Sequence, residues 1–354
     1  MKIKRHKKIY KINYITLGIA AFLCILLIIL LKWDSIENFK KNSNSQMIAK
    51  QFEQQNLQEK ESIRNVEESL PNIVCWGDSL TLGSGGNGTT YPSVLSKNIK
   101  LQVLNYGVGG ESAQLIASRQ GALKIYVNNI IIPSDTSAVE ITMVNDDNSK
   151  LDLLLQGDGG INPCTINDIE GTVTYNSTSK KYCFTRSTKG QKCTISEKTQ
   201  LITYAMKSKK DNDILIIFSG NNNSPTLKTL NELIKVQRQM IQYSGTDNYI
   251  IIGLTCKSSI SEVEKINQAL QKEYGDKFLD IRTYILENGL NDSGMTATGQ
   301  DKTDISNGEI PSSLRVDNIH GNASFYTIIG NQVYKKILEL KYLSDEQLGV
   351  LGIK

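Results

Sequence analysis

Residues 72–85 read NIVCWGDSLTLGSG, and this stretch carries the main evidence for the fold. Its apolar start, residues 73–76, has the composition of a strand that is buried on both faces. The strand runs directly into Gly-Asp-Ser and then into a glycine-rich turn. Ser79 is therefore either a nucleophile held at the end of a strand or an ordinary turn residue, because Gly-Asp-Ser is also common turn chemistry. The rest of the chain bears on that choice.

Short apolar runs recur along the chain and alternate with helical patterns. Four further runs are typical of buried parallel strands, namely residues 101–107, 213–220, 249–255 and 277–281. Helical periodicity is present at residues 226–244, 261–275 and about 322–340. This alternation predicts an α/β fold with a doubly wound, mainly parallel five-stranded sheet. In such a fold the functional groups lie at the C-terminal ends of the strands.

The alternation is interrupted between residues 122 and 204. This region holds short strand-like runs separated by turn residues, without a convincing helical pattern: LKIYV, AVEITMV, LDLLLQ, EGTVTYN and KKYCFTRS. The pattern predicts an inserted all-β module. The insertion is either a structural elaboration of one crossover or a module that binds substrate. The α/β domain is then formed by residues 71–121 and 205–345.

The N-terminal region combines a basic cluster with a long apolar run. Residues 1–32 hold seven basic and no acidic side chains, and YITLGIAAFLCILLIILL at 14–31 carries no charge. As a helix these 18 residues would extend about 27 Å, enough to span a bilayer. We predict a cytoplasmic tail at 1–13 and a single-pass transmembrane anchor at 14–32, with the body outside the cell. A cleaved signal peptide is the competing interpretation, but small residues at its cleavage positions are missing.

Residues 33–70 are rich in Gln, Glu, Lys, Asn and Ser, with scattered apolar side chains. The apolar spacing is too irregular for a coiled coil. We predict a helical or flexible stalk here, between the anchor and the body.

Charge and cysteine content exclude some classes of function. The net charge of +4 arises at the N-terminus, because removing seven of the 40 basic side chains leaves 33 against 36 acidic ones. The body is therefore mildly acidic, and no nucleic-acid partner is expected. No C-x-x-C pair occurs among the six cysteines, so neither a zinc site nor a redox site is predicted. Cys164, Cys183 and Cys193 lie close in sequence and leave room for one disulfide.

Four segments near the predicted strand ends carry polar groups of catalytic type. Ser79 lies in WGDSL, Gly110 in NYGVGGES and Asn222 in FSGNNNSP, while Asp317 and His320 lie in LRVDNIHGN. A hydroxyl, an imidazole and a carboxylate are the parts of a serine hydrolase. A glycine backbone and an amide side chain can supply the hydrogen bonds that stabilise an oxyanion.

The number of histidines narrows the assignment of a general base. The chain has two histidines, His6 in the predicted tail and His320. Imidazole-dependent chemistry outside the membrane must therefore use His320. Each glycine-containing motif by itself is also ordinary turn chemistry. Their joint order along the chain is what favours a catalytic function.

The four motif blocks and their order resemble the SGNH (GDSL-type) hydrolase family, serine esterases with a flavodoxin-like fold. The family is named for the Ser, Gly, Asn and His of these blocks. The resemblance covers residues 72–120 and 213–340 and excludes the anchor, the stalk and the β insertion.

The resemblance implies a role for each candidate residue. Ser79 would be the nucleophile, His320 the general base and Asp317 the carboxylate that orients the imidazole. The oxyanion hole would consist of the backbone N–H groups of Ser79 and Gly110 and the side-chain amide of Asn222. No metal or cofactor is required for this chemistry.

The third block departs from the family pattern. It commonly reads G-x-N-D, and here the last position is Asn223. Because that aspartate is not a triad member, we expect altered local hydrogen bonding and retained activity. Asn221 and Asn223 could compete with Asn222 for the oxyanion position.

Together these features predict a membrane-anchored, extracellular serine esterase. The expected reaction is removal of O-acetyl or other short acyl groups from carbohydrate, with an acylated carbohydrate or another small ester as substrate. A surface O-acyltransferase with the same triad is the alternative. A catalytically inert, glycan-binding surface protein is a third, non-enzymatic interpretation.

Overall fold

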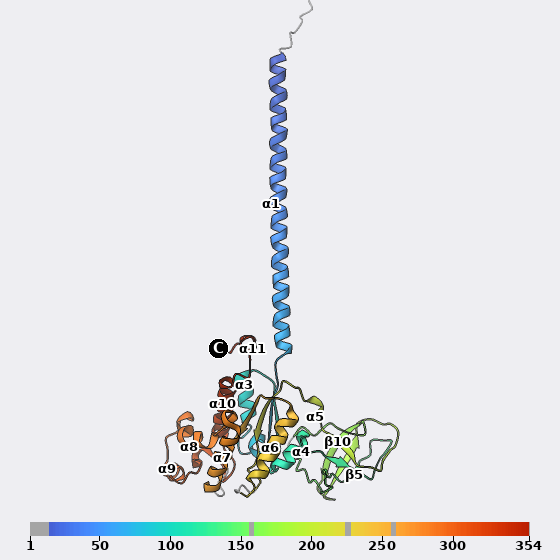
Figure 1. Ribbon diagram of the computed structural model, residues 1–354, viewed down its shortest axis with the longest axis vertical. Helices are drawn as coiled ribbons and strands as arrows, with labels where there is room; N and C mark the ends of the chain where they lie inside the picture. Colours follow the sequence, from blue (N-terminus) through green and yellow to red (C-terminus); the bar gives the residue numbers. More distant parts are fainter. Residues whose placement is uncertain (1–13, 156–158, 224–227, 256–259, 354) are drawn as a thin grey trace, which may run out of the picture. The chain divides into compact units, whose positions relative to one another are not determined.

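The computed structural model describes residues 14–155, 159–223, 228–255 and 260–353 (Figure 1). The chain divides into two compact units, Met1–Glu68 and Ser69–Lys354. The described part of the first unit is a single helix, α1 (Tyr14–Glu68), of 55 residues. Its helical conformation agrees with a helical stalk at the predicted positions.

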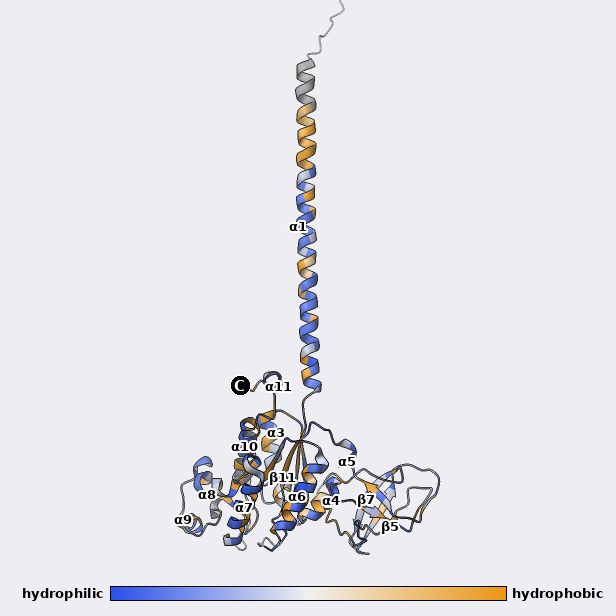
Figure 2. Ribbon diagram, viewed as in Figure 1, coloured by the Kyte–Doolittle hydropathy of each residue, from blue (hydrophilic) through white to orange (hydrophobic). Residues whose placement is uncertain are grey.

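The N-terminal part of α1 contains the predicted anchor. Figure 2 shows apolar residues concentrated in this part of the helix and polar residues along most of the remainder. The described apolar side chains here, from Phe22 to Leu31, are exposed, and the side chains of residues 14–21 lie outside the described part. Among the residues that are described, no helix combines the length and apolar character needed to cross a membrane. The anchor at 14–32 is thus not confirmed and stays a prediction.

The second unit is built on a five-stranded sheet in which the neighbouring strands are parallel, in the order β13-β12-β11-β1-β2. Its strands are β1 (Ile73–Gly77), β2 (Val103–Gly107), β11 (Ile214–Phe218), β12 (Tyr249–Ile252) and β13 (Phe278–Leu279). Every residue of β1 and β11 is buried, which is why these strands have continuously apolar sequences. The predicted parallel sheet is confirmed.

Helices cover both faces of this sheet. Their bounds are α2 (Ser79–Leu82), α3 (Tyr91–Ile99), α4 (Ala113–Gln120), α5 (Tyr204–Ser208), α6 (Leu230–Ser244), α7 (Ile260–Tyr274), α8 (Ile281–Asp292), α9 (Gly299–Ser306), α10 (Ala323–Glu339) and α11 (Asp345–Leu351). Alternate residues of β1 point to opposite faces. Ile73 and Cys75 pack with α3, α8 and α10, whereas Val74 and Trp76 pack with α4, α6 and α7. Leu351 of α11 joins the first core, so the α/β domain extends beyond the predicted end at residue 345.

The insertion is an all-β module, as predicted. A six-stranded sheet has the order β3-β10-β6-β7-β8-β5, and a second sheet pairs β4 with β9. The strands are β3 (Tyr126–Val127), β4 (Ile130–Ile132), β5 (Val139–Ile141), β6 (Cys164–Ile166), β7 (Ile169–Asn176), β8 (Lys181–Arg186), β9 (Cys193–Ile195) and β10 (Thr199–Ile202). They enclose their own apolar core. The hydroxyl of Thr203 donates to the carbonyl of Arg119 at 3.0 Å, which joins the two ends of the insertion.

One sequence-based expectation for the insertion differs from the structure, and one question that the sequence leaves open is answered. Residues 151–155 of the run LDLLLQ form no strand, although Leu151 and Leu153 are buried in the module core as alternate strand residues would be. Burial of the two leucines explains the apolar pattern, and backbone pairing of residues 151–155 is limited to the Leu151 N–H, which donates to the carbonyl of Met143 at 2.9 Å. The cysteines at 164, 183 and 193 are free thiols, so the disulfide for which the sequence leaves room is not formed.

A buried ion pair joins the sheet, the loop after β2 and the inserted module. Arg119 Nε and Glu111 Oε2 are 2.6 Å apart, and neither side chain has exposed surface. The guanidinium also donates to the carbonyls of Gly77 at the end of β1 (3.4 Å), Tyr106 in β2 (3.1 Å) and Gly159 in the insertion. Burial raises the pKa of Glu111 and lowers the pKa of Arg119, and the attraction between the two charges opposes both shifts.

We expect Arg119→Met to destabilise the protein by about 3–5 kcal/mol, because it leaves Glu111 as an unpaired buried charge. Urea unfolding followed by circular dichroism measures the loss. Lys181→Met is the matched control, since it breaks a pair with Glu140 in which both side chains are 56% exposed and should cost less than about 1 kcal/mol. Equal losses for the two variants would contradict a central role for Arg119.

Candidate active site

Ser79 lies at the C-terminal end of β1, in the first turn of the short helix α2. Asp78 is the N-cap of α2 and accepts a hydrogen bond from the N–H of Leu80 at 2.9 Å. A side chain at Gly77 would come within 2.0 Å of the Thr81 hydroxyl and 2.5 Å of a backbone oxygen, so this turn requires glycine. The N–H of Ser79 has no acceptor within the helix, since it belongs to the first helical residue. Ser79 is thus fixed on a rigid turn with an available backbone donor.

The second part of the site is a tight turn that begins at Asp317. Its Oδ1 accepts hydrogen bonds from the backbone N–H groups of Ile319 and His320, both at 2.7 Å. Its Oδ2 is 2.8 Å from Nδ1 of His320, and Nε2 of His320 is 2.8 Å from Oγ of Ser79. Residues 79, 317 and 320 therefore form a continuous hydrogen-bonded chain. The structure brings together the three residues that the sequence analysis selected as a triad.

The environment of Asp317 keeps its carboxylate ionised. Burial alone would raise its pKa, but the hydrogen bonds from His320 and Ile319 lower the pKa to about 2. An ionised carboxylate at Nδ1 favours the tautomer in which that nitrogen carries the proton. Nε2 then presents a lone pair to the Ser79 hydroxyl. The arrangement can remove a proton from Ser79 and stabilise the resulting imidazolium.

The two remaining candidates lie around this chain without a direct hydrogen bond to Ser79 in the structure. Gly110 has φ of +79°, a conformation that glycine adopts without strain. Asn222 Nδ2 donates to the carbonyl of Glu111 at 3.1 Å and to Oδ2 of Asp78 at 3.2 Å. Its amide thus bonds to the neighbours in sequence of both Ser79 and Gly110. This places all three motif blocks around one position.

The neighbouring asparagines are directed elsewhere. Asn223 accepts a hydrogen bond from the N–H of Ala113 at 2.8 Å and donates to Gln114 at 2.8 Å, both at the start of α4. Asn221 accepts from the N–H of Thr255 at 3.3 Å. Asn223 therefore supports the N-terminus of α4. It occupies the position at which the departure from the G-x-N-D pattern was expected to alter hydrogen bonding.

Asp78 is a polar group of the site that the sequence analysis did not select. It has no exposed surface, and burial raises its pKa to about 7, with partial opposition from the Leu80 N–H and the charge of His320. Its side chain accepts from Asn222 as well as from its own helix. Near neutral pH a protonated and an ionised Asp78 therefore coexist beside the Asn222 amide.

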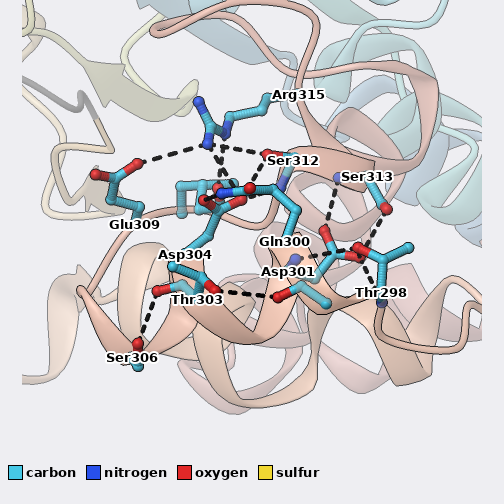
Figure 3. Close-up of polar contacts among 12 residues, drawn as sticks. Thr298, Gln300, Asp301, Thr303, Asp304, Ser306, Glu309, Ser312, Ser313 and Arg315 are labelled. Carbon is cyan, nitrogen blue, oxygen red and sulfur yellow. Dashed lines mark hydrogen bonds and ion pairs between the residues drawn. The ribbon is translucent and has the colours of Figure 1, made fainter.

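A second group of missed residues supports the turn that carries Asp317. Figure 3 shows Asp301 and Asp304 of α9 facing Ser312 and Ser313. Asp301 accepts from the N–H and hydroxyl of Ser313 at 2.9 and 2.8 Å. Asp304 accepts from the N–H and hydroxyl of Ser312 at 2.8 and 2.5 Å. The bonded serines form the 3₁₀ turn η2 (Ser312–Leu314), which ends three residues before Asp317.

Arg315 completes this network. It contacts Asp304 at 3.2 Å and Glu309 at 3.5 Å (Figure 3). Burial would raise the pKa of Asp304, but hydrogen bonds, with those from Ser312 the largest among them, lower it to about 2. The capping pattern Thr298-x-x-Asp301 is visible in the sequence, but its bonds to Ser313, 12 residues away, are not. The network ties the segment before the Asp317 turn to α9.

Comparisons with known proteins found a likeness at the level of solved structures. No family model and no curated protein matches the chain. A protein of the lipolytic G-D-S-L family from Desulfitobacterium hafniense DCB-2 is 14% identical, with a TM-score of 0.39 over 75% of this chain and 99% of that one. A member of the same family from Veillonella parvula DSM 2008 is 14% identical, with a TM-score of 0.39 over 77% of this chain and 98% of that one. A likeness at this level adds nothing to the geometry of the site.

We expect stability to fall as pH decreases from about 4 to about 2. The pKa of Asp304 is lowered on folding, so its contribution is present above its unfolded value and is lost as pH falls through its folded value of about 2. The measurement is the urea midpoint of unfolding at pH 6 and at pH 3. The loss of stability between these two pH values should be smaller in Asp304→Asn than in the wild type.

Asp211→Asn is the control for this experiment, because the Asp211 side chain is 97% exposed. Its urea midpoint should depend on pH as the wild-type midpoint does. An unchanged pH dependence in Asp304→Asn would refute the contribution of the network to acid stability.

Proposed function

We propose that the chain is a serine esterase of the SGNH type that uses Ser79, His320 and Asp317. The observation that carries the proposal is the unbroken chain from Asp317 through His320 to Ser79, with 2.8 Å at each step. It joins side chains that are up to 241 positions apart in sequence. A structural role alone would not require a hydroxyl, an imidazole and an ionised carboxylate in this order.

The reaction begins when Ser79 Oγ attacks the carbonyl carbon of an ester and its proton passes to Nε2 of His320. The ester C–O bond then breaks, and the departing alcohol takes that proton from Nε2. Water adds to the acyl-enzyme and gives a proton to Nε2. The bond to Oγ breaks, Oγ recovers the proton, and a carboxylic acid is released. Asp317 holds the imidazole and balances its charge throughout.

The negative charge on the carbonyl oxygen is stabilised by the N–H groups of Ser79 and Gly110 and by the amide of Asn222. In the free protein the Asn222 amide donates to Asp78 and Glu111. We propose that the bond to Asp78, the longer of the two, is exchanged for one to the oxyanion. Because the exchange occurs in the transition state, it should affect turnover more than substrate binding.

The proposed substrate is an acylated carbohydrate or another small ester with a short acyl group. The basis for a surface glycan is the predicted anchor at 14–32 and the helical segment 33–68, which would tether the domain to the cell membrane on the extracellular side. An O-acyltransferase would use the same triad with a sugar hydroxyl in place of water. An inert glycan-binding protein is disfavoured, because such a protein would not need Ser79, His320 and Asp317 in the hydrogen-bonded order that they have here.

We expect Ser79→Ala and His320→Ala to lower hydrolysis of p-nitrophenyl acetate by at least about 10³-fold, because the nucleophile and its base act as a unit. A fluorophosphonate probe should label the wild type at Ser79 and leave Ser79→Ala unlabelled. Ser179→Ala, which alters an exposed serine between β7 and β8, is the matched control. Activity retained by His320→Ala would overturn the assignment of the base.

The same variants separate hydrolysis from acyl transfer. Release of acetate from an O-acetylated glycan that depends on Ser79 supports the esterase. Labelling of Ser79 without acetate release, together with transfer of the acyl group to an added sugar, supports the acyltransferase. Absence of labelling at Ser79 argues against both enzymes.

We expect Asn222→Ala to lower kcat about 10²–10³-fold with little change in KM, since it removes a donor used in the transition state. Asn223→Ala is the matched control. Asn223 bonds to the start of α4. Its replacement should therefore lower the Tm and leave kcat nearly unchanged. A change confined to KM in Asn222→Ala would assign the oxyanion bond to another group.

A further inference from the structure

Exposed apolar side chains gather near the proposed catalytic groups. In the described part of the second unit, the large apolar side chains with substantial exposure are Ile131, Leu154, Tyr175, Tyr204, Val316 and Ile319. Val316 and Ile319 flank Asp317 and His320 in sequence. Leu154 comes from the inserted module and is 39% exposed. Two of the six are thus sequence neighbours of the proposed catalytic residues, and Leu154 reaches the loop of Gly110 from outside the α/β domain.

Leu154 lies directly over the proposed oxyanion loop. A Cβ built on Gly110 would be 3.0 Å from Cδ1 of Leu154. The backbone N–H of Leu154 donates to the carboxylate of Glu111 at 3.4 Å. Both contacts fall on the loop between β2 and α4, which carries the backbone donor of the proposed oxyanion hole.

Polar contacts hold the backbone at Leu154 and at the residue before it. Leu153 is 1% exposed, and its carbonyl accepts a hydrogen bond from the Tyr182 hydroxyl of β8. Further along, the carbonyl of Gly159 accepts from Arg119, the partner of Glu111. A side chain held in this way can act as a steric limit, because moving it would disturb buried polar contacts.

The chemistry of ester cleavage defines which part of the substrate Leu154 would meet. His320 must deliver a proton to the departing alcohol, so the alcohol lies on the side of His320. The carbonyl oxygen lies at the N–H groups of Ser79 and Gly110. The acyl chain then points away from His320, past Gly110.

We propose that Leu154 closes the acyl-chain end of the site and restricts the enzyme to short acyl groups. This inference rests on the proposed esterase function and gives the inserted module a role in acyl-group selection. The α/β domain supplies the reacting groups, while the insertion determines the length of acyl chain that fits beside them. The substrate is recognised here by apolar contact between the Leu154 side chain and the acyl chain.

The test compares the kcat/KM values of the full chain for p-nitrophenyl hexanoate and p-nitrophenyl acetate. Leu154→Ala should raise the hexanoate-to-acetate ratio by at least about 10-fold, since each methylene accommodated in an apolar pocket changes discrimination by about 10-fold or more. Leu154→Phe should lower the butyrate-to-acetate ratio. Ile131→Ala, at another exposed apolar position of the module, should leave both ratios unchanged.

The outcomes separate the inference from the proposed function. If no ester is hydrolysed in a Ser79-dependent manner, the esterase proposal fails and the inference fails with it. If hydrolysis depends on Ser79 but Leu154→Ala leaves the chain-length ratio unchanged, the inference alone is overturned. Fluorophosphonate labelling of each Leu154 variant verifies that the site is assembled. A change in the chain-length ratio of kcat/KM then cannot be attributed to misfolding.

Discussion

The Arg119 guanidinium is the point at which the parts of the second unit meet. It is fully buried and contacts the end of β1, the end of β2, the inserted module and the carboxylate of Glu111. Glu111 in turn accepts the Asn222 amide on its carbonyl and the Leu154 N–H on its side chain. A single cation without solvent access must have all its donors matched. This requirement fixes the loop after β2 relative to the end of β1, where Ser79 begins its helix.

Much of the α/β architecture was predictable because fully buried parallel strands have continuously apolar sequences. The grouping of His320 with Asp317 and Ser79 was predictable as well, since His320 is one of only two histidines and follows an aspartate by three residues. The run at 151–155 was misassigned because its alternate leucines are buried although the run forms no strand. The network around Asp301 could not be inferred, because in a sequence an isolated aspartate has the same appearance whether it is solvated or bonded to a distant turn.

Asp317, Asp304 and Asp78 carry the same carboxylate group in three different environments. Asp317 accepts two backbone N–H groups and the imidazole, so its charged form is favoured. Asp304 is held in the same way by Ser312. Asp78 is fully buried but accepts hydrogen bonds from only the Leu80 N–H and the Asn222 amide among the described contacts. Its pKa therefore rises to about 7. The number of donors relative to burial therefore separates Asp317, which stays ionised beside His320, from Asp78, whose pKa lies near neutral.

The hydrogen bond between the Thr203 hydroxyl and the Arg119 carbonyl has a consequence for how such a protein can diversify. The chain leaves the α/β body and returns to it at adjacent points, so the length of what lies between is nearly free of constraint from the sheet, and closing a longer loop costs little. A module of another size could be exchanged at this junction while the sheet stays unchanged, provided that it supplies an acceptor for Arg119 in place of the Gly159 carbonyl. Under the proposed function, selectivity and reactivity would then evolve largely on separate segments of the chain, coupled through the contacts of Arg119 and Glu111.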